Sequence, residues 1–220
     1  MRKLLAALLC FSAPVLAEQP NVKYNTPESL GCIILKECTE EVQKITNVNQ
    51  LNTVVTDPNF EIIKDETAQL IKAINDVNVE IFVASGKYFP FGVQGIYHSL
   101  YNRMYLNKFY MQKSKFLLGT IRHEGWHAAQ DCMAGTLDNS VVAVIMDDKD
   151  IPKIYKFLTS KTYASQPKSI PWEQEANWAE ATKSMTVNAL KACSAGEMWN
   201  TYKPTPLTKK YLVEHGYIEN

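Results

Sequence analysis

The pattern His123-Glu124-Gly125-Trp126-His127 contains the residue types that hydrolyse an amide bond with the help of a metal ion. Residues four apart lie on one face of a helix, so His123 and His127 can direct both imidazoles at one Zn²⁺ ion. Glu124 then lies beside that ion, where its carboxylate can take the proton of the water that attacks a carbonyl group. The pattern predicts His123 and His127 as metal ligands and Glu124 as the general base. The alternative is a chance match.

A catalytic zinc ion usually takes three protein ligands, so the two histidines need a third partner. The run from Glu173 to Asn177, EQEAN, resembles the third-ligand motif of gluzincin-type zinc metallopeptidases. It is similar to E-x-x-A-D of the HtpX and CAAX-prenyl-protease group and to E-x-E-A-N of the ImmA/IrrE-like proteins. The resemblance implies that Glu173, on a later helix, is the third zinc ligand. It also implies that Asn177 accepts a hydrogen bond from a ligand histidine.

Helical geometry separates Glu173 from Glu175, because two positions turn a helix by about 200°. Only one of the two carboxylates can therefore face the metal. Asn177 follows Glu173 by four residues and shares its face, whereas Glu175 has Ala179 at that offset. This favours Glu173 as the ligand and predicts that Glu175 is solvent-facing or ion-paired.

The chain also departs from the known patterns. Asn177 is neutral where the HtpX group has an aspartate, and the membrane helices of that group are missing. No histidine follows His127 at the spacing of the metzincin pattern HExxHxxGxxH, which argues against that class. Tyr155 and Tyr163 lie between the two motifs, but neither can be assigned to oxyanion stabilisation from the sequence. The remaining histidines of the mature chain, His98 and His215, are more simply interpreted as surface residues than as substrate ligands.

A helix from about Lys115 to Cys132 must position the two histidines. Ser114 can cap its start and Gly135 can end it. Gly119 and Gly125 lie inside this helix, and each costs about 1 kcal/mol relative to alanine. We therefore expect other elements to pack against the helix and compensate for the two glycines.

Apolar periodicity and turn residues predict the remaining elements. The prediction comprises helices from Pro27 to about Asn47, Asp57 to Asn75 and Ile151 to Leu158, a strand from Val79 to Ala84, a hairpin of Ile96 to Tyr101 and Met104 to Lys108, one straight helix from Trp172 to about Cys193, and a short final helix. The alternative for the first of these helices is a break near Cys38 and Thr39. This order predicts an α+β, zincin-like fold, in which a small antiparallel or mixed sheet packs on the HExxH helix beside a second ligand-bearing helix. The segment Ile96 to Tyr101 is a candidate edge strand for binding a peptide by strand addition. Alternatively, its tyrosines only pack against the sheet.

Composition predicts a single exported domain. Residues 1–17 have the features of a secretory signal peptide: Arg2 and Lys3, an apolar run, and Val15-Leu16-Ala17 as a cleavage site. The whole chain is 46% hydrophobic, which is enough apolar material for a buried core. Residues 18–220 are therefore predicted to form one metallopeptidase domain. No later run reaches the roughly 18 to 20 apolar residues that cross a bilayer, so no membrane span is expected after signal removal. An uncleaved N-terminal anchor is the alternative.

Charge argues against a nucleic-acid partner, because the mature chain is close to neutral. Its four cysteines suggest two disulfides, although buried thiols are the alternative. On one straight helix Cys193 lies about 30 Å from Glu173, while Cys132 is about 7 Å from His127, so these two cysteines should be far apart. Cys32 and Cys38 are about 9 Å apart on a continuous helix, beyond disulfide reach. The favoured arrangement ties the N-terminal segment to Cys132 and to Cys193.

The sequence thus predicts a secreted or periplasmic zinc-dependent metallopeptidase that hydrolyses peptide or protein substrates through a metal-activated water. The alternative is a catalytically inactive zincin-fold protein with a bound metal and a binding or inhibitory role.

Overall fold

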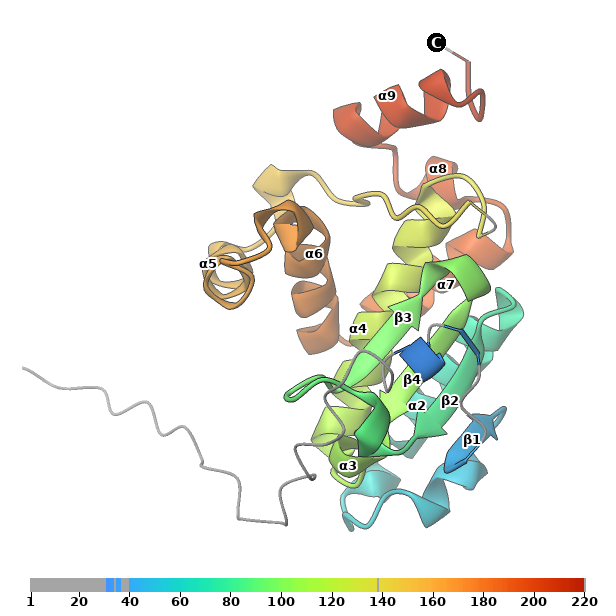
Figure 1. The fold of residues 1–220 in the computed structure, drawn as a ribbon. Coiled ribbons are helices and arrows are strands. Elements are labelled where there is room, and N and C mark those ends of the chain that lie inside the picture. The colour runs from blue at the N-terminus through green and yellow to red at the C-terminus, as the bar shows by residue number, and fades with distance from the viewer. Residues whose placement is uncertain (1–30, 34, 37–39, 138, 220) are drawn as a thin grey trace, which may run out of the picture.

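The computed structural model describes residues 31–33, 35, 36, 40–137 and 139–219 of the chain (Figure 1). The predicted signal peptide, residues 1–17, and Cys38 lie outside this part. The strands are β1 (Val42–Ile45), β2 (Glu80–Ala84), β3 (Gly95–His98) and β4 (Arg103–Asn107). The α-helices are α2 (Phe60–Asp76), α3 (Lys108–Met111), α4 (Ser114–Met133), α5 (Lys153–Thr162), α6 (Ile170–Ala181), α7 (Met185–Ser194), α8 (Met198–Thr201) and α9 (Pro206–Glu214). The 3₁₀ helices are Val48–Thr53, Gly86–Tyr88, Ser99–Tyr101, Asp148–Asp150 and Pro167–Ser169.

The four strands form one mixed sheet in the order β1-β2-β4-β3. β1 is antiparallel to β2, β2 is parallel to β4, and β3 is antiparallel to β4. The predicted hairpin is confirmed, with Gly95 opposite Leu106 and His98 opposite Arg103. Asn102 takes a left-handed conformation in its turn, with φ 51°. The hairpin therefore places β3 at one edge of the sheet.

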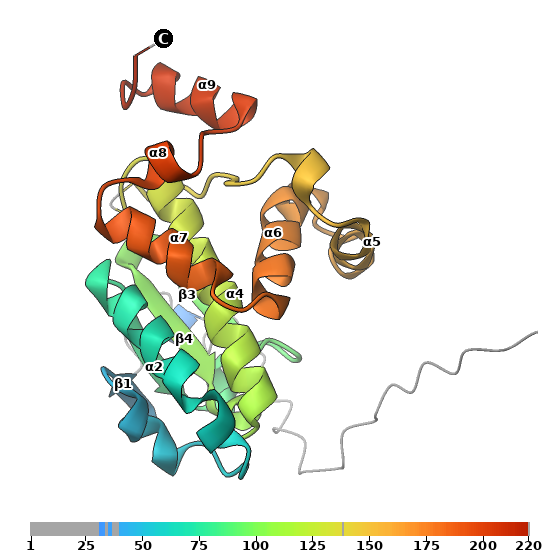
Figure 2. The same ribbon diagram turned by 180° about the vertical axis from the view of Figure 1, so that it is seen from behind.

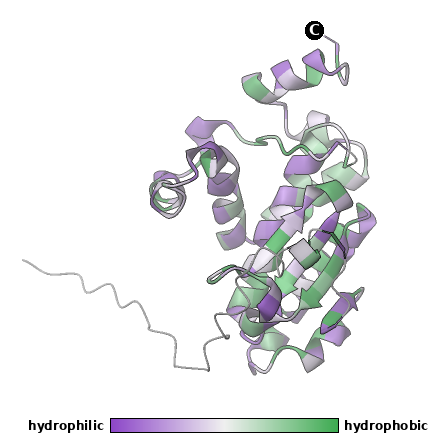
Figure 3. Cartoon of the chain, viewed as in Figure 1, coloured by the Kyte–Doolittle hydropathy of each residue, from purple (hydrophilic) through white to green (hydrophobic). Residues whose placement is uncertain are grey.

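Alternation along the strands divides the apolar residues between two clusters. Met104 and Leu106 of β4 belong to the main core, whereas Tyr105 between them belongs to a smaller cluster on the other face. Helices α2 and α4 cover the main face, and α7 packs against both of them on the side away from the sheet (Figure 2). Hydrophobic residues are concentrated in the sheet (Figure 3). The α+β class with a small mixed sheet is thus confirmed.

Asp57 orders the starts of two helices. Its Oδ1 accepts a hydrogen bond from the backbone N–H of Asn59 at 3.0 Å, just before α2. Its Oδ2 accepts one from the backbone N–H of Ser114 at 3.1 Å, at the first residue of α4. The predicted helix after Asp57 is confirmed, with its first residue at Phe60. The predicted cap of α4 is corrected, because Asp57 and not the Ser114 side chain supplies the acceptor.

The predicted helix from Pro27 to Asn47 is wrong in its second half. Val42–Ile45 is strand β1, and Glu41 before it has a positive φ of 54°. Three-residue spacing is helical, but in a strand it places Val42 and Ile45 on opposite faces. Ile45 accordingly joins the main core, and Val42 packs on the smaller cluster. Residues 27–30 of this prediction lie outside the described residues.

The predicted straight helix from Trp172 to Cys193 is also wrong. It consists of α6 and α7, and Ser184 between them has a positive φ of 65°. The break turns α7 back along α4, so Cys193 forms a disulfide with Cys132 across a Cα–Cα distance of 6.0 Å. Cys32 is also disulfide-bonded and thus pairs with neither of them. The predicted separation of Cys132 from Cys193, and the predicted ties to the N-terminal segment, are therefore incorrect.

Helices α5 and α6, here called the arm, extend away from the sheet (Figures 1 and 2). The predicted helix over Ile151 to Leu158 is confirmed as α5, and the short final helix is confirmed as α9. Three large apolar side chains of α5 are half exposed: Ile154 (56%), Phe157 (58%) and Leu158 (50%). None of the helices in the described part of the chain has the length and apolar character needed to cross a membrane.

Candidate metal centre

Three predicted ligands meet where α4 faces α6. His123, His127 and Glu173 each offer one ligand atom, and these atoms lie within 4.8 Å of one another. Glu173 Oε2 is 3.2 Å from His123 Nε2, and Glu173 Oε1 is 3.6 Å from His127 Nε2. All three side chains are largely buried. No other group of three or more His, Cys, Asp and Glu in the described residues can hold a metal ion.

One unsatisfied atom indicates that the group fits a cation. Glu173 Oε2 is buried and has no hydrogen-bond partner, because its contact with His123 Nε2 lacks hydrogen-bond geometry. Leaving a buried acceptor unsatisfied costs about 1 to 3 kcal/mol, and more when the group is charged. Two imidazole nitrogens with one carboxylate oxygen are a ligand set of catalytic zinc sites. The three residues therefore fit Zn²⁺.

Negative charge around His123 favours a bound cation. Burial lowers the pKa of His123, but the carboxylates of Glu173 and Glu180 outweigh burial and raise the pKa to about 10. Burial alone would raise the pKa of Glu173, yet His123 and His127 bring it below the ordinary value. The carboxylates thus stabilise a positive charge at this position, and a metal ion would take the place of the imidazole proton.

Glu124 lies in a buried position between α4 and the edge strand β3. A Cβ added to Gly95 would be only 2.5 Å from Thr120 Cγ2 and 2.9 Å from Glu124 Cγ, so a side chain at position 95 would collide with the helix. Burial raises the pKa of Glu124, against the positive charges of His123 and His127. A carboxylate with a raised pKa accepts and returns protons more readily near neutral pH.

The Nδ1 atoms of His123 and His127, which face away from Glu173, do not contact Asn177 as predicted. His127 Nδ1 is 2.8 Å from Gln130 Oε1, and His123 Nδ1 is 3.4 Å from Glu180 Oε2. Asn177 instead donates from Nδ2 to Thr159 Oγ1 of α5, at 2.8 Å. The predicted contact of Asn177 with a ligand histidine is therefore incorrect, because α5 packs against that side of α6.

The sequence spacing of Gln130 and Glu180 could have indicated both of these contacts with the ligand histidines. Gln130 follows His127 by three residues, and Glu180 follows Glu173 by seven, so each lies near the face of its ligand. Tyr163, which could not be assigned a role from the sequence, lies at the end of α5. Burial and the negative charge of Glu173 raise the pKa of Tyr163, so its hydroxyl stays protonated beside the candidate ligand.

Glu175 is fully buried, which corrects the prediction of a solvent-facing or ion-paired side chain. The two-residue step does turn it away from Glu173, but that side of α6 faces Trp126 of α4 and the segment 143–146. Glu175 accepts hydrogen bonds from Trp126 Nε1 and from the backbone N–H groups of Ile145 and Met146. Burial raises the pKa of Glu175 to about 7, against these donors.

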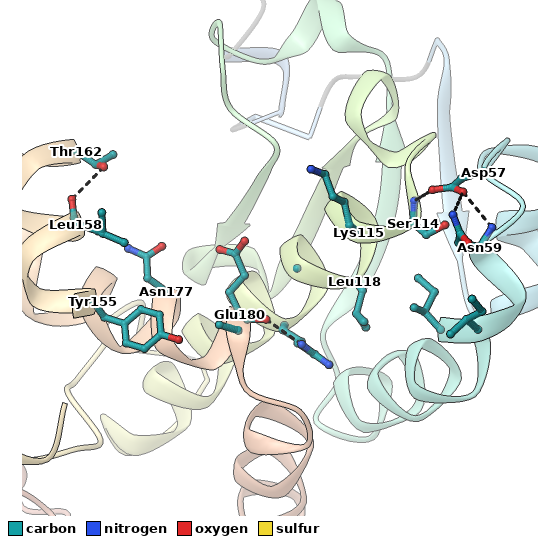
Figure 4. Close-up of a pocket in the computed structure, with 15 residues that line it drawn as sticks. Asp57, Asn59, Ser114, Lys115, Leu118, Tyr155, Leu158, Thr162, Asn177 and Glu180 are labelled. Carbon is teal, nitrogen blue, oxygen red and sulfur yellow. Dashed lines mark hydrogen bonds between the residues drawn. The ribbon is translucent and has the colours of Figure 1, made fainter. Parts of the chain in front are cut away.

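One hollow borders Glu180, whose carboxylate faces His123, and a second follows the edge strand β3. A groove of about 750 Å³ runs from Leu158 of α5 past Glu180 and Leu118 to Asn59, just before α2 (Figure 4). A hollow of about 430 Å³ follows β3 and is lined by Ile96 and His98, among others. His98, predicted as a surface residue, is only partly exposed, and its Nδ1 is buried without a hydrogen-bond partner.

Comparison with known proteins adds no family assignment: no family model, no curated protein and no solved structure matches the chain.

Proposed function

We propose that the protein is a zinc-dependent metallopeptidase with a zincin-like fold. The observation that supports this proposal is the convergence of His123, His127 and Glu173, from two helices, within 4.8 Å. Glu124 adds a buried carboxylate beside the two histidines. A structural zinc site would need the three ligands but not this fourth group, so Glu124 favours an enzyme over a metal-stabilised binding or inhibitory protein.

His123, His127 and Glu173 would hold Zn²⁺, which lowers the pKa of a water and polarises the carbonyl group of a substrate. Glu124 takes a proton from the attacking water and transfers it to the nitrogen of the leaving amine. The raised pKa of Glu124 suits both proton transfers. We assign to Tyr163, whose hydroxyl stays protonated beside Glu173, a hydrogen bond to the oxyanion that would form from the substrate carbonyl.

The substrate class that fits is an extended peptide. β3 pairs only with β4 in the described part of the sheet, and its Gly95 approaches Glu124 closely. A peptide that added a strand to β3 would pass the base and the metal ligands with its backbone hydrogen-bonded. The hollow lined by Ile96 and His98 would then receive its side chains.

The disulfide chemistry of the protein fits an oxidising compartment. The disulfide between Cys132 and Cys193 supports export, since such bonds persist outside the cytoplasm. We therefore include in the proposal a secreted or periplasmic location and cleavage of the predicted signal peptide.

Metal analysis followed by hydrolysis of a mixed peptide library tests the proposal. Purified protein should contain zinc and cleave peptides, and a chelator should abolish the cleavage. Glu124→Gln should keep zinc but lose roughly 10²- to 10⁴-fold in turnover, because an amide cannot accept the proton. Glu61→Gln, on the exposed side of α2, is the matched control and should retain full activity.

Three outcomes contradict the proposal in different ways. Protein without affinity for zinc overturns the metal site. Zinc without hydrolysis of any peptide favours the inactive binding or inhibitory protein. An unchanged rate in Glu124→Gln removes Glu124 from the role of base.

A further inference from the structure

Four N–H groups converge on the buried carboxylate of Glu175. Trp126 Nε1 donates at 3.2 Å and Gln130 Nε2 at 2.8 Å, both to Oε2. The backbone N–H of Ile145 donates to both oxygens, at 3.0 and 3.1 Å, and that of Met146 donates to Oε1 at 2.7 Å. Each contact needs an acceptor, so this position requires a carboxylate. A glutamine here would direct its own NH₂ group at other donors.

The carboxylate fixes which way the Gln130 amide points. Gln130 Nε2 donates to Glu175 Oε2 and, at 3.1 Å, to the backbone carbonyl of Trp172. A flipped amide would bring its oxygen against these two acceptors, which repel it. Gln130 Oε1 must therefore point the other way, and there it lies 2.8 Å from His127 Nδ1.

The orientation of Gln130 in turn selects the tautomer of His127. An amide oxygen can only accept, so His127 Nδ1 carries a proton and the lone pair is left on Nε2. Nε2 is the atom that faces Glu173. We propose that Glu175 is a positioning residue, which acts through Gln130 to keep His127 in the tautomer that presents Nε2 to the metal. This proposal rests on the metal site of the proposed function and identifies the chain of contacts that prepares it.

The outer nitrogen of His123 has a longer and more exposed contact than that of His127. Its Nδ1 faces Glu180, whose side chain is 45% exposed and 3.4 Å away. Two of the donors to Glu175 belong to the segment at Ile145 and Met146, which contains no metal ligand. Glu175 therefore links α4, α6 and this segment at one buried point.

The first test compares Glu175→Gln with the wild type. We expect zinc affinity to fall about 10- to 100-fold, the usual effect of losing an outer contact to a ligand histidine. In metal-free protein at mildly alkaline pH, long-range ¹H–¹⁵N NMR should show the Nδ1–H tautomer of His127 in the wild type. The variant should show a mixture of both tautomers, since its Gln130 is free to flip.

Two further variants make the result decisive. Asp131→Asn is the matched control. Asp131 is also a fully buried carboxylate, on α4, and it accepts a hydrogen bond from the Tyr97 hydroxyl, so the tautomer of His127 should not change. Gln130→Leu removes the amide but leaves Glu175 with its other donors. It should reproduce the mixture of tautomers even if Glu175→Gln does not fold.

A folded Gln130→Leu protein that keeps the Nδ1–H tautomer overturns the proposal, as does an unchanged tautomer in folded Glu175→Gln. The tautomer is measured without metal. A wild-type protein that shows the Nδ1–H form but binds no zinc would therefore refute the proposed function and not the contact chain.

Discussion

The two helices that supply the candidate ligands are held in different ways. Helix α4 is enclosed by α2, α7 and the sheet, and more than half of its residues are buried. The arm, α5 and α6, is enclosed on fewer sides, and α5 leaves three large apolar side chains half exposed. The histidines therefore come from the part of the molecule with the most apolar burial, and Glu173 comes from a part with much less.

The contacts that join each partner to α4 differ in kind. α7 is joined by apolar packing and by the disulfide between Cys132 and Cys193. The arm packs the small side chains of Ala176 and Ala179 into the core, and polar contacts add to this: the buried ones of Glu175, and an exposed hydrogen bond of 3.0 Å from Arg122 Nη1 to the backbone carbonyl of Glu180. Polar contacts are directional, so the arm is held in one orientation by few groups. A metal ion would add a further link between the arm and α4.

Glu173→Ala should have the largest effect on the site, because it removes the only candidate ligand from the arm. Zinc affinity should fall by more than the roughly 10- to 100-fold that loss of an outer contact costs. In the wild type, zinc should slow amide hydrogen exchange in the arm more than in α4, and the variant should lose this protection. Isothermal titration and hydrogen-exchange mass spectrometry measure the two effects.

The matched control for this variant is Glu214→Ala, which removes an exposed glutamate of α9. It should leave both measurements unchanged. Normal zinc affinity in Glu173→Ala would show that the arm does not complete the site and would remove the proposed link.

The same contrast explains how much of the site could be predicted from sequence. α4 and the hairpin follow from local periodicity and turn residues. The meeting of His123, His127 and Glu173 follows from two motifs whose residues have fixed helical spacing. These features depend on neighbours in sequence, and the structure retains them.

The missed features depend on contacts between distant segments. Ser184 breaks the helix between α6 and α7 without a glycine or proline, and the apolar positions on both sides continue the helical period. The burial of Glu175 depends on the backbone of Ile145 and Met146, which no side-chain pattern marks. Asn177 shares the face of Glu173 but is held by Thr159 of α5. Most of these failures lie in or next to the arm, where tertiary contacts decide each orientation.

Removing the disulfide should have the next largest effect. Cys132 and Cys193 are 61 residues apart in sequence and enclose the whole arm. Replacing both with serine should lower the free energy of unfolding by about 2 to 4 kcal/mol, because the unfolded chain is no longer constrained by the loop. Denaturant unfolding of the double variant against the wild type measures this difference.

The single variants Cys132→Ser and Cys193→Ser are the controls, because each removes only this bond, whereas reduction would also open the disulfide of Cys32. Both should match the double serine variant. A loss below about 0.5 kcal/mol, the range of ordinary surface substitutions, would show that apolar packing alone holds α7 to α4. The difference between α7 and the arm in how they are held to α4 would then come from apolar burial and not from the disulfide.

A pair of glycine substitutions gives the smallest effects but compares the two sides of α4 directly. Alanine is favoured over glycine inside a helix by about 1 kcal/mol, so both variants start with the same gain. At Gly119 an added Cβ would lie 3.0 Å from Glu180 Oε1, the end of a flexible and partly exposed side chain of the arm. Glu180 can move aside, so Gly119→Ala should stabilise the protein by up to about 1 kcal/mol.

At Gly125 the same change meets the core side of the helix. The added Cβ would lie 2.8 Å from Thr186 Cγ2 of α7 and 3.5 Å from Ile74 Cδ1 of α2. Thr186 is buried and donates from Oγ1 to the backbone carbonyl of Arg122 at 2.8 Å, so it cannot rotate away without losing that bond. Overpacking a core costs about 1 to 3 kcal/mol, which exceeds the helical gain over most of that range. Gly125→Ala should therefore destabilise the protein in urea unfolding while Gly119→Ala does not. Equal effects of the two variants would mean that the arm packs on α4 as tightly as α7 does.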